Sequence, residues 1–304
     1  MPVNFTDSTI RLPAITLVSG CARTGTSLVG RLVSTFPNTV YEYEPSMLSS
    51  LIGQMNVIES KTLKSLWDSY IVWESVIPSL AGRRLNLHPL DESSALRYLS
   101  DGEIARRHSK SWTQAELLPL VPDQHVCLKL PDISPLLADL NELLGVGTRI
   151  VLTGRSPLPT IRSLVGRRWF DDSLDPRLIW QCRWQEGAPV PFWVPQERIH
   201  EFHRASAVGK ASLYYLAMHE SSAAYQDALH VPFEQLLSNP EEVCDAVANF
   251  LGLQPTEMTR NVIQSIEQDR NSGGDDLRRD IPKSLLNELY DVWSSWPGLW
   301  MNGI

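Results

Sequence analysis

A loop of small and hydroxyl-bearing residues follows the first apolar run of the chain. The run at residues 15–18 leads into the loop Gly-Cys-Ala-Arg-Thr-Gly-Thr-Ser at residues 20–27, and apolar residues at helical spacing then cover residues 27–35. Backbone N–H groups at the start of a helix point the same way as the helix dipole, and together they bind anions. Arg23 adds a positive charge, and Thr26 and Ser27 add hydroxyl groups. We therefore expect this strand–loop–helix unit to hold a phosphate or sulfate group.

The loop differs from the P-loop of ATP-binding proteins. That motif has the form GxxxxGK[ST], but no Lys follows Gly25 here, and the loop carries its cation at Arg23 instead. A P-loop kinase, which would also need Mg²⁺, is therefore an alternative with less support. A strand–helix turn with a surface Arg is the alternative that carries no function.

Three more short apolar runs predict buried strands, at residues 126–130, 149–153 and 230–233. Helical patterns lie between and after them, at residues 134–144, 205–219, 240–251 and 283–293. This alternation predicts an α/β fold of three layers, in which helices flank a central parallel sheet. We expect one domain over residues 1–304, with the loops at 20–27 and 155–163 meeting at the carboxyl edge of the sheet. Two Trp-rich segments without clear periodicity, residues 46–124 and 169–204, are expected to be insertions.

The composition excludes several classes of protein. The chain has 304 residues, of which 43% are hydrophobic, as in a globular protein with a sizeable core. No apolar run approaches the roughly 20 residues that span a membrane, and the N-terminus does not resemble a signal peptide, so we expect a cytoplasmic protein. The net charge of −8 argues against a nucleic-acid partner. The four cysteines form no CxxC pair and the seven histidines show no metal-ligand spacing, so we expect buried thiols and no metal.

Three segments of the chain resemble the sulfotransferases that use 3′-phosphoadenosine 5′-phosphosulfate (PAPS). Residues 19–37, SGCARTGTSLVGRLVSTFP, are similar to the 5′-phosphosulfate loop of that family, written GxPRSGTT, with Ala22, Thr24 and Ser27 in place of Pro, Ser and Thr. Residues 149–169, RIVLTGRSPLPTIRSLVGRRW, resemble its 3′-phosphate segment, and residues 231–253, VPFEQLLSNPEEVCDAVANFLGL, resemble a later segment. The resemblance implies metal-free transfer of a sulfuryl group from PAPS to a hydroxyl or amine of a small-molecule acceptor, which leaves 3′-phosphoadenosine 5′-phosphate (PAP).

The resemblance also implies which residues bind the cofactor. The 5′-phosphosulfate is expected at Arg23, Thr24, Gly25, Thr26 and Ser27. Arg155 and Ser163, eight residues apart, have the family's spacing for the 3′-phosphate, and Arg167 lies one helical turn beyond Ser163. Arg suits this task because its planar fork of donors matches phosphate oxygens. A solvated helix face is the alternative for Arg167.

A late loop at residues 269–280 resembles, more loosely, the segment that covers the nucleotide in the family. It contains Arg270, Ser272 and Arg278. Gly273 and Gly274 permit the backbone to approach a ligand closely. Without the resemblance, this segment is a polar loop with charges of both signs.

Sulfuryl transfer needs a base for the acceptor proton and cations beside the leaving oxygen. Arg23 and Lys129 are the candidate cations, because the family often carries a Lys near the end of the corresponding strand. Cytosolic sulfotransferases place a His two residues after that Lys, but Pro131 stands there in this chain. In tyrosylprotein sulfotransferases the base is a Glu twenty-one residues after the loop Arg, and this count leads to Glu44. Glu42 would point the same way in an extended segment and is the second candidate. The alternative is an edge strand with both acids in water.

The two Trp-rich segments are expected to form the acceptor pocket, because such pockets are apolar with a few placed polar groups. The aromatic candidates are Trp67, Tyr70, Trp73, Trp112, Trp169, Trp180, Trp184 and Trp193. Core packing is the alternative for each of them. The sequence identifies neither the acceptor nor the oligomeric state; bacterial secondary metabolites and carrier-bound intermediates suit a protein without a membrane anchor. A nucleotide-binding module without turnover is the second functional hypothesis.

Overall fold

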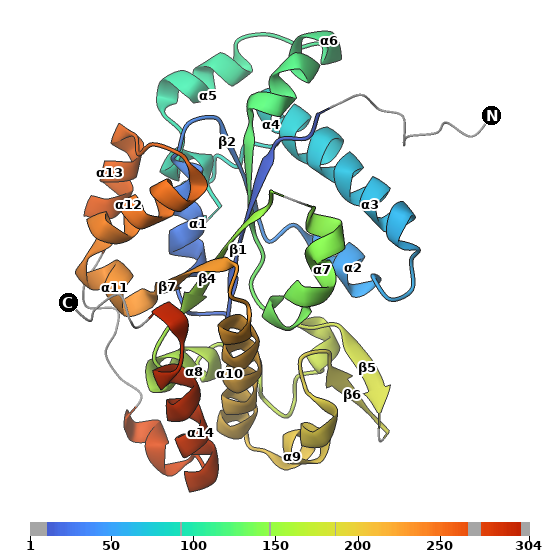
Figure 1. Ribbon diagram of the computed structural model, residues 1–304, viewed down its shortest axis with the longest axis vertical. Helices are drawn as coiled ribbons and strands as arrows, with labels where there is room; N and C mark the ends of the chain where they lie inside the picture. Colours follow the sequence, from blue (N-terminus) through green and yellow to red (C-terminus); the bar gives the residue numbers. More distant parts are fainter. Residues whose placement is uncertain (1–10, 92, 146, 186, 267–274, 299–304) are drawn as a thin grey trace.

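The computed structural model describes residues 11–91, 93–145, 147–185, 187–266 and 275–298. Its centre is a parallel sheet of five strands in the order β2-β3-β1-β4-β7 (Figure 1). The strands are β1 (Ala14–Gly20), β2 (Thr39–Tyr43), β3 (His125–Lys129), β4 (Arg149–Gly154) and β7 (Ala228–Pro232). A separate antiparallel hairpin pairs β5 (Cys182–Gln185) with β6 (Ala188–Pro191). The predicted α/β fold with a central parallel sheet is confirmed.

The inner strands are buried on both faces, which explains their unbroken apolar sequences. Leu17 and Val18 are neighbours in β1 and point to opposite faces, yet neither is exposed. A strand whose two faces are both covered by helices needs no alternation of polar and apolar residues. The four predicted strands match the inner strands β1, β3 and β4 and the edge strand β7 to within two residues at each end. The remaining strand, β2, forms one edge of the sheet and has no comparable apolar run.

Helices cover both faces of this sheet (Figure 1). One face packs against α2 (Ser46–Gly53), α3 (Ser60–Ser69), a π-helix at Tyr70–Val76 and α7 (Leu137–Leu144). The other face packs against α1 (Thr26–Ser34), α11 (Phe233–Ser238), α12 (Pro240–Leu251) and α13 (Glu257–Gln264). A third apolar cluster lies beyond the carboxyl ends of the strands, where α8 (Pro157–Val165) and α14 (Lys283–Ser294) pack against α10 (Ala207–Ala224). The remaining short helices are α4 (Ile77–Leu80), α5 (Asp101–His108), α6 (Gln114–Leu117) and α9 (Ile199–Arg204).

The bounds of α12 coincide with the helix predicted at residues 240–251. Pro240 occupies its first position, where the missing N–H costs nothing, and Gly252 ends it with a φ of +69°. The strength of these two signals explains the agreement.

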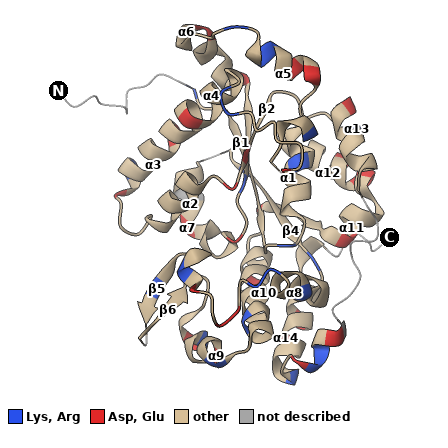
Figure 2. Ribbon diagram, turned by 180° about the vertical axis from the view of Figure 1, so that it is seen from behind, with Lys and Arg blue, Asp and Glu red and all other residues tan. Residues whose placement is uncertain are grey.

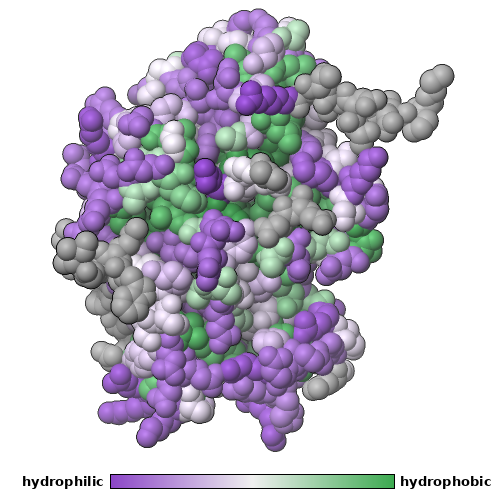
Figure 3. Space-filling view, in the orientation of Figure 1, coloured by the Kyte–Doolittle hydropathy of each residue, from purple (hydrophilic) through white to green (hydrophobic). Residues whose placement is uncertain are grey.

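Polar residues cover most of the face drawn in Figure 3, and apolar atoms show between them. No helix in the described part of the chain is both long enough and apolar enough to cross a membrane.

Candidate functional site

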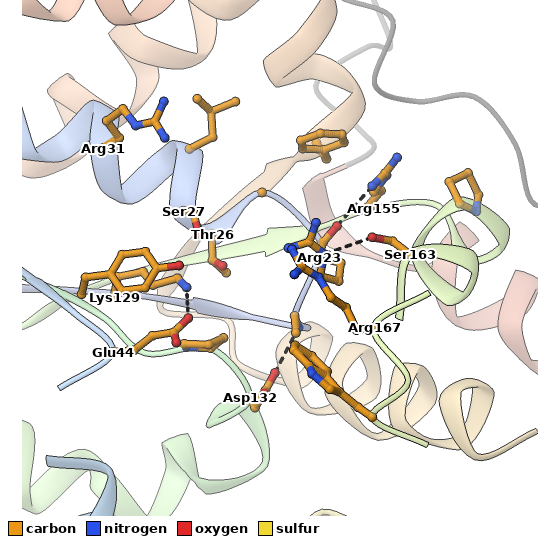
Figure 4. A pocket seen from close by; sticks show the side chains of 18 of the residues that line it. Arg23, Thr26, Ser27, Arg31, Glu44, Lys129, Asp132, Arg155, Ser163 and Arg167 are labelled. Atoms are coloured by element: carbon orange, nitrogen blue, oxygen red, sulfur yellow. Dashed lines mark hydrogen bonds and ion pairs between the residues drawn. The ribbon is translucent and has the colours of Figure 1, made fainter. Parts of the chain in front are cut away.

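A cavity of about 860 Å³ opens at the carboxyl edge of the sheet (Figure 4). Among the described residues, six Lys and Arg side chains line it: Arg23, Arg31, Lys129, Arg155, Arg162 and Arg167. Two carboxylates, Glu44 and Asp132, line it as well. In Figure 2 basic residues lie around α8, which forms one side of this cavity. Because the whole chain has a net charge of −8, the cavity concentrates positive charge in an otherwise acidic protein.

Two glycines give the loop between β1 and α1 its shape. Gly20 has a φ of +134°, and a Cβ there would lie 2.3 Å from the carbonyl oxygen of Thr153. Gly25 precedes α1 with a φ of +99°, and a Cβ there would lie 2.6 Å from Cδ2 of Phe233. Only glycine fits these positions, because the backbone is left-handed and also runs against a neighbouring element. The close approach brings Gly25 and the first two residues of α1 into the cavity wall.

Thr24 was predicted to bind the cofactor, and in the structure its side chain holds the loop to the sheet. The residue is fully buried, and its hydroxyl donates to the carbonyl oxygen of Cys21 at 2.6 Å. The same hydroxyl lies 2.7 Å from the hydroxyl of Thr153 in β4. Thr24 is absent from the described residues that line the cavity. Spacing along the chain located the loop, but it does not determine which way one side chain within the loop turns.

The loop between β4 and α8 meets the first loop at Arg23. Arg23 Nε donates to Ser163 Oγ at 3.0 Å, and Arg155 Nη1 donates to the carbonyl oxygen of Arg23 at 3.3 Å. The guanidinium carbon of Arg155 lies 4.5 Å from the centre of the Phe233 ring. Burial lowers the pKa of this guanidinium. The predicted meeting of the two loops is confirmed, and the side chain of Arg167 points toward the same place in Figure 4.

Lys129 and Glu44 form an ion pair in the cavity wall. Lys129 ends β3, and Glu44 directly follows the neighbouring strand β2. The backbone N–H of Glu44 donates to the carbonyl oxygen of Lys129 at 2.9 Å, and Nζ of Lys129 lies 4.3 Å from the centre of the Tyr43 ring. Lys129 is buried, whereas the Glu44 side chain is 46% exposed. A buried ammonium group therefore orients an accessible carboxylate.

Asp132 also lines the cavity, and the sequence analysis missed it. Its carboxylate accepts a hydrogen bond from the backbone N–H of Ala22 at 3.0 Å and another from the hydroxyl of Tyr214. Burial raises the pKa of this carboxyl to about 6, although both hydrogen bonds oppose the shift. One feature of the sequence could have identified Asp132: it is a charged residue just beyond the strand that carries Lys129, at the sheet edge where the other candidate residues lie.

Sulfotransferases are among the solved structures that match nearly the whole chain. A sulfotransferase domain from the curacin biosynthetic pathway matches with a TM-score of 0.50 at 14% identity, over 93% of this chain and 97% of that chain. This chain has the sulfotransferase fold.

Two further structural matches have lower scores. A sulfotransferase domain from the olefin synthase of Synechococcus PCC 7002 has a TM-score of 0.44 at 15% identity, over 94% of this chain and 89% of that chain. Retinol dehydratase in complex with androsterone and inactive cofactor PAP has a TM-score of 0.33 at 14% identity, over 92% and 70%. No protein-family model and no curated protein matches the chain. The assignment of the fold therefore rests on the curacin-pathway domain.

Glu42 lies outside the cavity of this sulfotransferase fold. Its carboxylate is buried, accepts a hydrogen bond from the Tyr70 hydroxyl at 3.1 Å and lies 3.4 Å from a guanidinium nitrogen of Arg84. Burial raises the pKa of this carboxyl. Glu42 and Glu44 were expected to share one face if the segment was extended. The strand ends at Tyr43, and the φ of +48° at Glu44 breaks that alternation.

Most of the aromatic candidates for an acceptor pocket pack in the interior. Four of the eight come from residues 46–124 and belong to or pack against the core on one face of the sheet: Trp67, Tyr70, Trp73 and Trp112. Trp180 and Trp193 are buried together in a second cluster, with ring centres 5.5 Å apart, while Trp184 is 66% exposed. Within the described residues, Trp169 is the one of the eight that lines the cavity. The alternative of core packing therefore holds for six of them.

Only part of the late loop at residues 269–280 lies within the described residues. Arg270 and Ser272 lie outside the described residues. Arg278 is described, and its guanidinium donates to the hydroxyl of Tyr290 at 3.1 Å rather than lining the cavity. In the described ranges, no three His, Cys, Asp or Glu residues form a group that could hold a metal ion.

Proposed function

We propose that this protein is a sulfotransferase that transfers the sulfuryl group of PAPS to a hydroxyl or amine of a small molecule. The observation that carries the proposal is the convergence of two β–α loops on one positively charged cavity, through the contacts of Arg23 with Ser163 and Arg155. A cation-lined cavity at this edge suits a ligand with several anionic groups.

The residues of the cavity fit PAPS, which carries anionic groups on both the 5′ and the 3′ side of the ribose. The loop at Gly25 offers close backbone approach and the start of a helix, and Arg23 supplies a guanidinium beside it. Arg155, Ser163 and Arg167 supply donors for the second anionic group. The cavity volume of about 860 Å³ falls in the usual range for sites of small ligands and cofactors.

The same cavity provides groups suited to sulfuryl transfer. PAPS, when bound, supplies the activated sulfuryl group. We infer that Glu44 takes the proton of the acceptor, because its carboxylate is accessible and is oriented by Lys129. Lys129 and Arg23 stabilise negative charge that develops beside them. Tyr43, Trp169 and Ile179 form apolar parts of the wall, where the body of an acceptor would pack.

Calorimetric titration with PAP in metal-free buffer tests the cofactor assignment. The wild type is expected to bind, and Arg155→Ala is expected to bind at least tenfold more weakly, because a buried donor of the site is removed. Arg168→Ala is the matched control, since the Arg168 side chain is 80% exposed and pairs with Asp171 instead of lining the cavity.

Two outcomes separate this proposal from the alternatives. Binding of ATP with Mg²⁺ but not of PAP would contradict the proposal and support a P-loop kinase. Binding of PAP with no sulfuryl transfer to any member of a broad panel of phenols, alcohols and amines would support a nucleotide-binding module without turnover.

A further inference from the structure

Asp132, just beyond the end of β3, makes two hydrogen bonds to the start of the loop between β1 and α1. We call this loop, residues 20–27, the anion loop. The backbone N–H of Asp132 donates to the carbonyl oxygen of Gly20 at 3.0 Å, and its carboxylate accepts from the backbone N–H of Ala22 at 3.0 Å. The two hydrogen bonds lie on either side of Cys21, so one residue fixes both ends of this short stretch. Tyr214 in α10 donates its hydroxyl to the same carboxylate, which ties the loop to a third element.

Several titratable and charged groups surround this carboxylate. Lys129 and Glu44 stand at the ends of β3 and β2, Cys21 and Tyr214 lie in the loop and in α10, and Arg23 and Arg167 share the cavity. The pKa of Asp132 is raised to about 6, first by burial and also by the charge of Glu44, while the hydrogen bonds and Lys129 oppose the shift. At pH 7.5 the carboxyl is therefore still mostly ionised in the free protein.

The ionised carboxylate of Asp132 repels an anion that binds in the same cavity. The backbone N–H of Ala22 belongs to the loop that holds the 5′-phosphosulfate in the proposed function, yet it donates to a carboxylate. Binding of a polyanion beside that carboxylate disfavours its ionised form, because like charges repel at short range. Protonation removes this repulsion, and a protonated carboxyl still accepts the hydrogen bond from Ala22.

We propose that Asp132 is a positioning residue of the anion loop and takes up one proton when a phosphorylated nucleotide binds there. The inference rests on the proposed function, because it takes PAP as the ligand of the loop. The complex binds one more proton than the free components, so the affinity for PAP falls as pH rises. The fall is about tenfold per pH unit between the pKa values of Asp132 in the free and bound states.

Calorimetry at pH 7.5 in two buffers of different ionisation enthalpy tests the proton uptake directly. The phosphates of PAP are almost fully ionised at this pH, since their second pKa lies near 6, and they contribute little. The wild type is expected to take up close to one proton per PAP. Asp132→Asn is expected to take up none and to bind PAP with an affinity that changes less than twofold between pH 7 and pH 8.

Two further variants decide the assignment. Glu44→Gln removes the other carboxylate of the cavity and is expected to retain the proton uptake; loss of the uptake in Glu44→Gln but not in Asp132→Asn overturns the inference. Tyr214→Phe removes one donor from Asp132 and one acceptor from the backbone N–H of Ala22, and it leaves a fully buried ring in place. Tyr214→Phe is expected to move the pH of maximum proton uptake upward, because loss of a donor raises the pKa of Asp132. This variant tests the inference if Asp132→Asn does not fold, and an unmoved maximum overturns it.

Failure of the inference can be told from failure of the proposed function. Binding of PAP by the wild type without proton uptake overturns the role of Asp132 alone. Absence of PAP binding at every pH overturns the proposed function and, with it, this inference.

Discussion

Three charged residues of the cavity share an uncommon backbone conformation. Arg23, Glu44 and Asp132 have φ values of +73°, +48° and +69°, and each follows the carboxyl end of a different parallel strand. Residues other than glycine adopt this region rarely and at a cost in free energy, and such residues cluster at functional sites. The turn after each strand brings a charged side chain to the cavity that the three strands share.

Glu42 in β2 and Glu44 just after it allow a paired test of which carboxylate takes the acceptor proton. Glu44→Gln is expected to reduce the rate of sulfuryl transfer by about 100-fold or more while leaving PAP affinity within about threefold, because only the proton acceptor is lost. Glu42→Gln is expected to leave transfer nearly unchanged and to lower the free energy of unfolding by about 1 kcal/mol, since the buried hydroxyl of Tyr70 and the exposed guanidinium of Arg84 lose a charged acceptor. Single-turnover assays and thermal melts measure the two effects; equal loss of transfer in both variants contradicts this division.

The site residues that the sequence predicted best are those whose position follows from a strand end. The loop motif located Arg23, the family resemblance located Lys129, Arg155 and Glu44, and all four line the cavity. The direction of a side chain depends on local φ values and on neighbours from distant parts of the chain. For that reason the side chains of Thr24 and Glu42 turn away from the cavity, and Asp132 was missed.

At the scale of elements, the apolar run within a strand decided whether the sequence could predict it. The inner strands β1, β3 and β4 and the edge strand β7 contain such runs and were found. The other edge strand, β2, is buried at four of its five positions, but its sequence Thr-Val-Tyr-Glu-Tyr mixes polar and apolar residues and gives no such signal. The helices of residues 46–124 were not predicted; most of them are short, with eight residues in α2 and α5 and four in α4 and α6.

The loop between β1 and α1 runs so close to α11 that a side chain at Gly25 would meet Phe233. Gly25→Ala is expected to weaken PAP binding at least tenfold and to lower the melting temperature, because its Cβ would meet Phe233. Gly252→Ala is the matched control, since it has a similarly positive φ but no atom within 4 Å of the added Cβ. The control is expected to cost about 1 kcal/mol of stability and to leave PAP binding unchanged. Calorimetry and thermal melts measure both; a similar loss of binding in the control would show that general destabilisation, and not the contact with Phe233, is responsible.

At the scale of the whole molecule, the contrast between an acidic chain and a basic cavity determines how anions reach the site. The net charge of −8 repels anions at long range, whereas the Lys and Arg side chains that line the cavity attract them within it. Added salt screens both interactions, but most strongly the long-range one.

PAP affinity is therefore expected to fall several-fold between 50 mM and 500 mM NaCl, because the contacts inside the cavity are charged. Arg155→Ala is expected to show a shallower dependence on salt than the wild type, and Arg168→Ala an unchanged one, since only the first lines the cavity. Titrations across a salt series measure the slopes. A salt dependence equal in all three proteins would contradict a charge-based site.

The order of strands in the sheet has a consequence for synthesis of the chain. The central strand β1 pairs with β3 and β4, and β2 pairs with β3, so neither early strand has its neighbour until residues 125–129 leave the ribosome. At 5–20 residues per second, roughly 5–20 s pass between completion of β1 and arrival of β3. During that interval an apolar strand with two open edges is exposed, and such segments aggregate readily. The nascent chain is thus expected to depend on chaperone protection before the first half of the protein has been made.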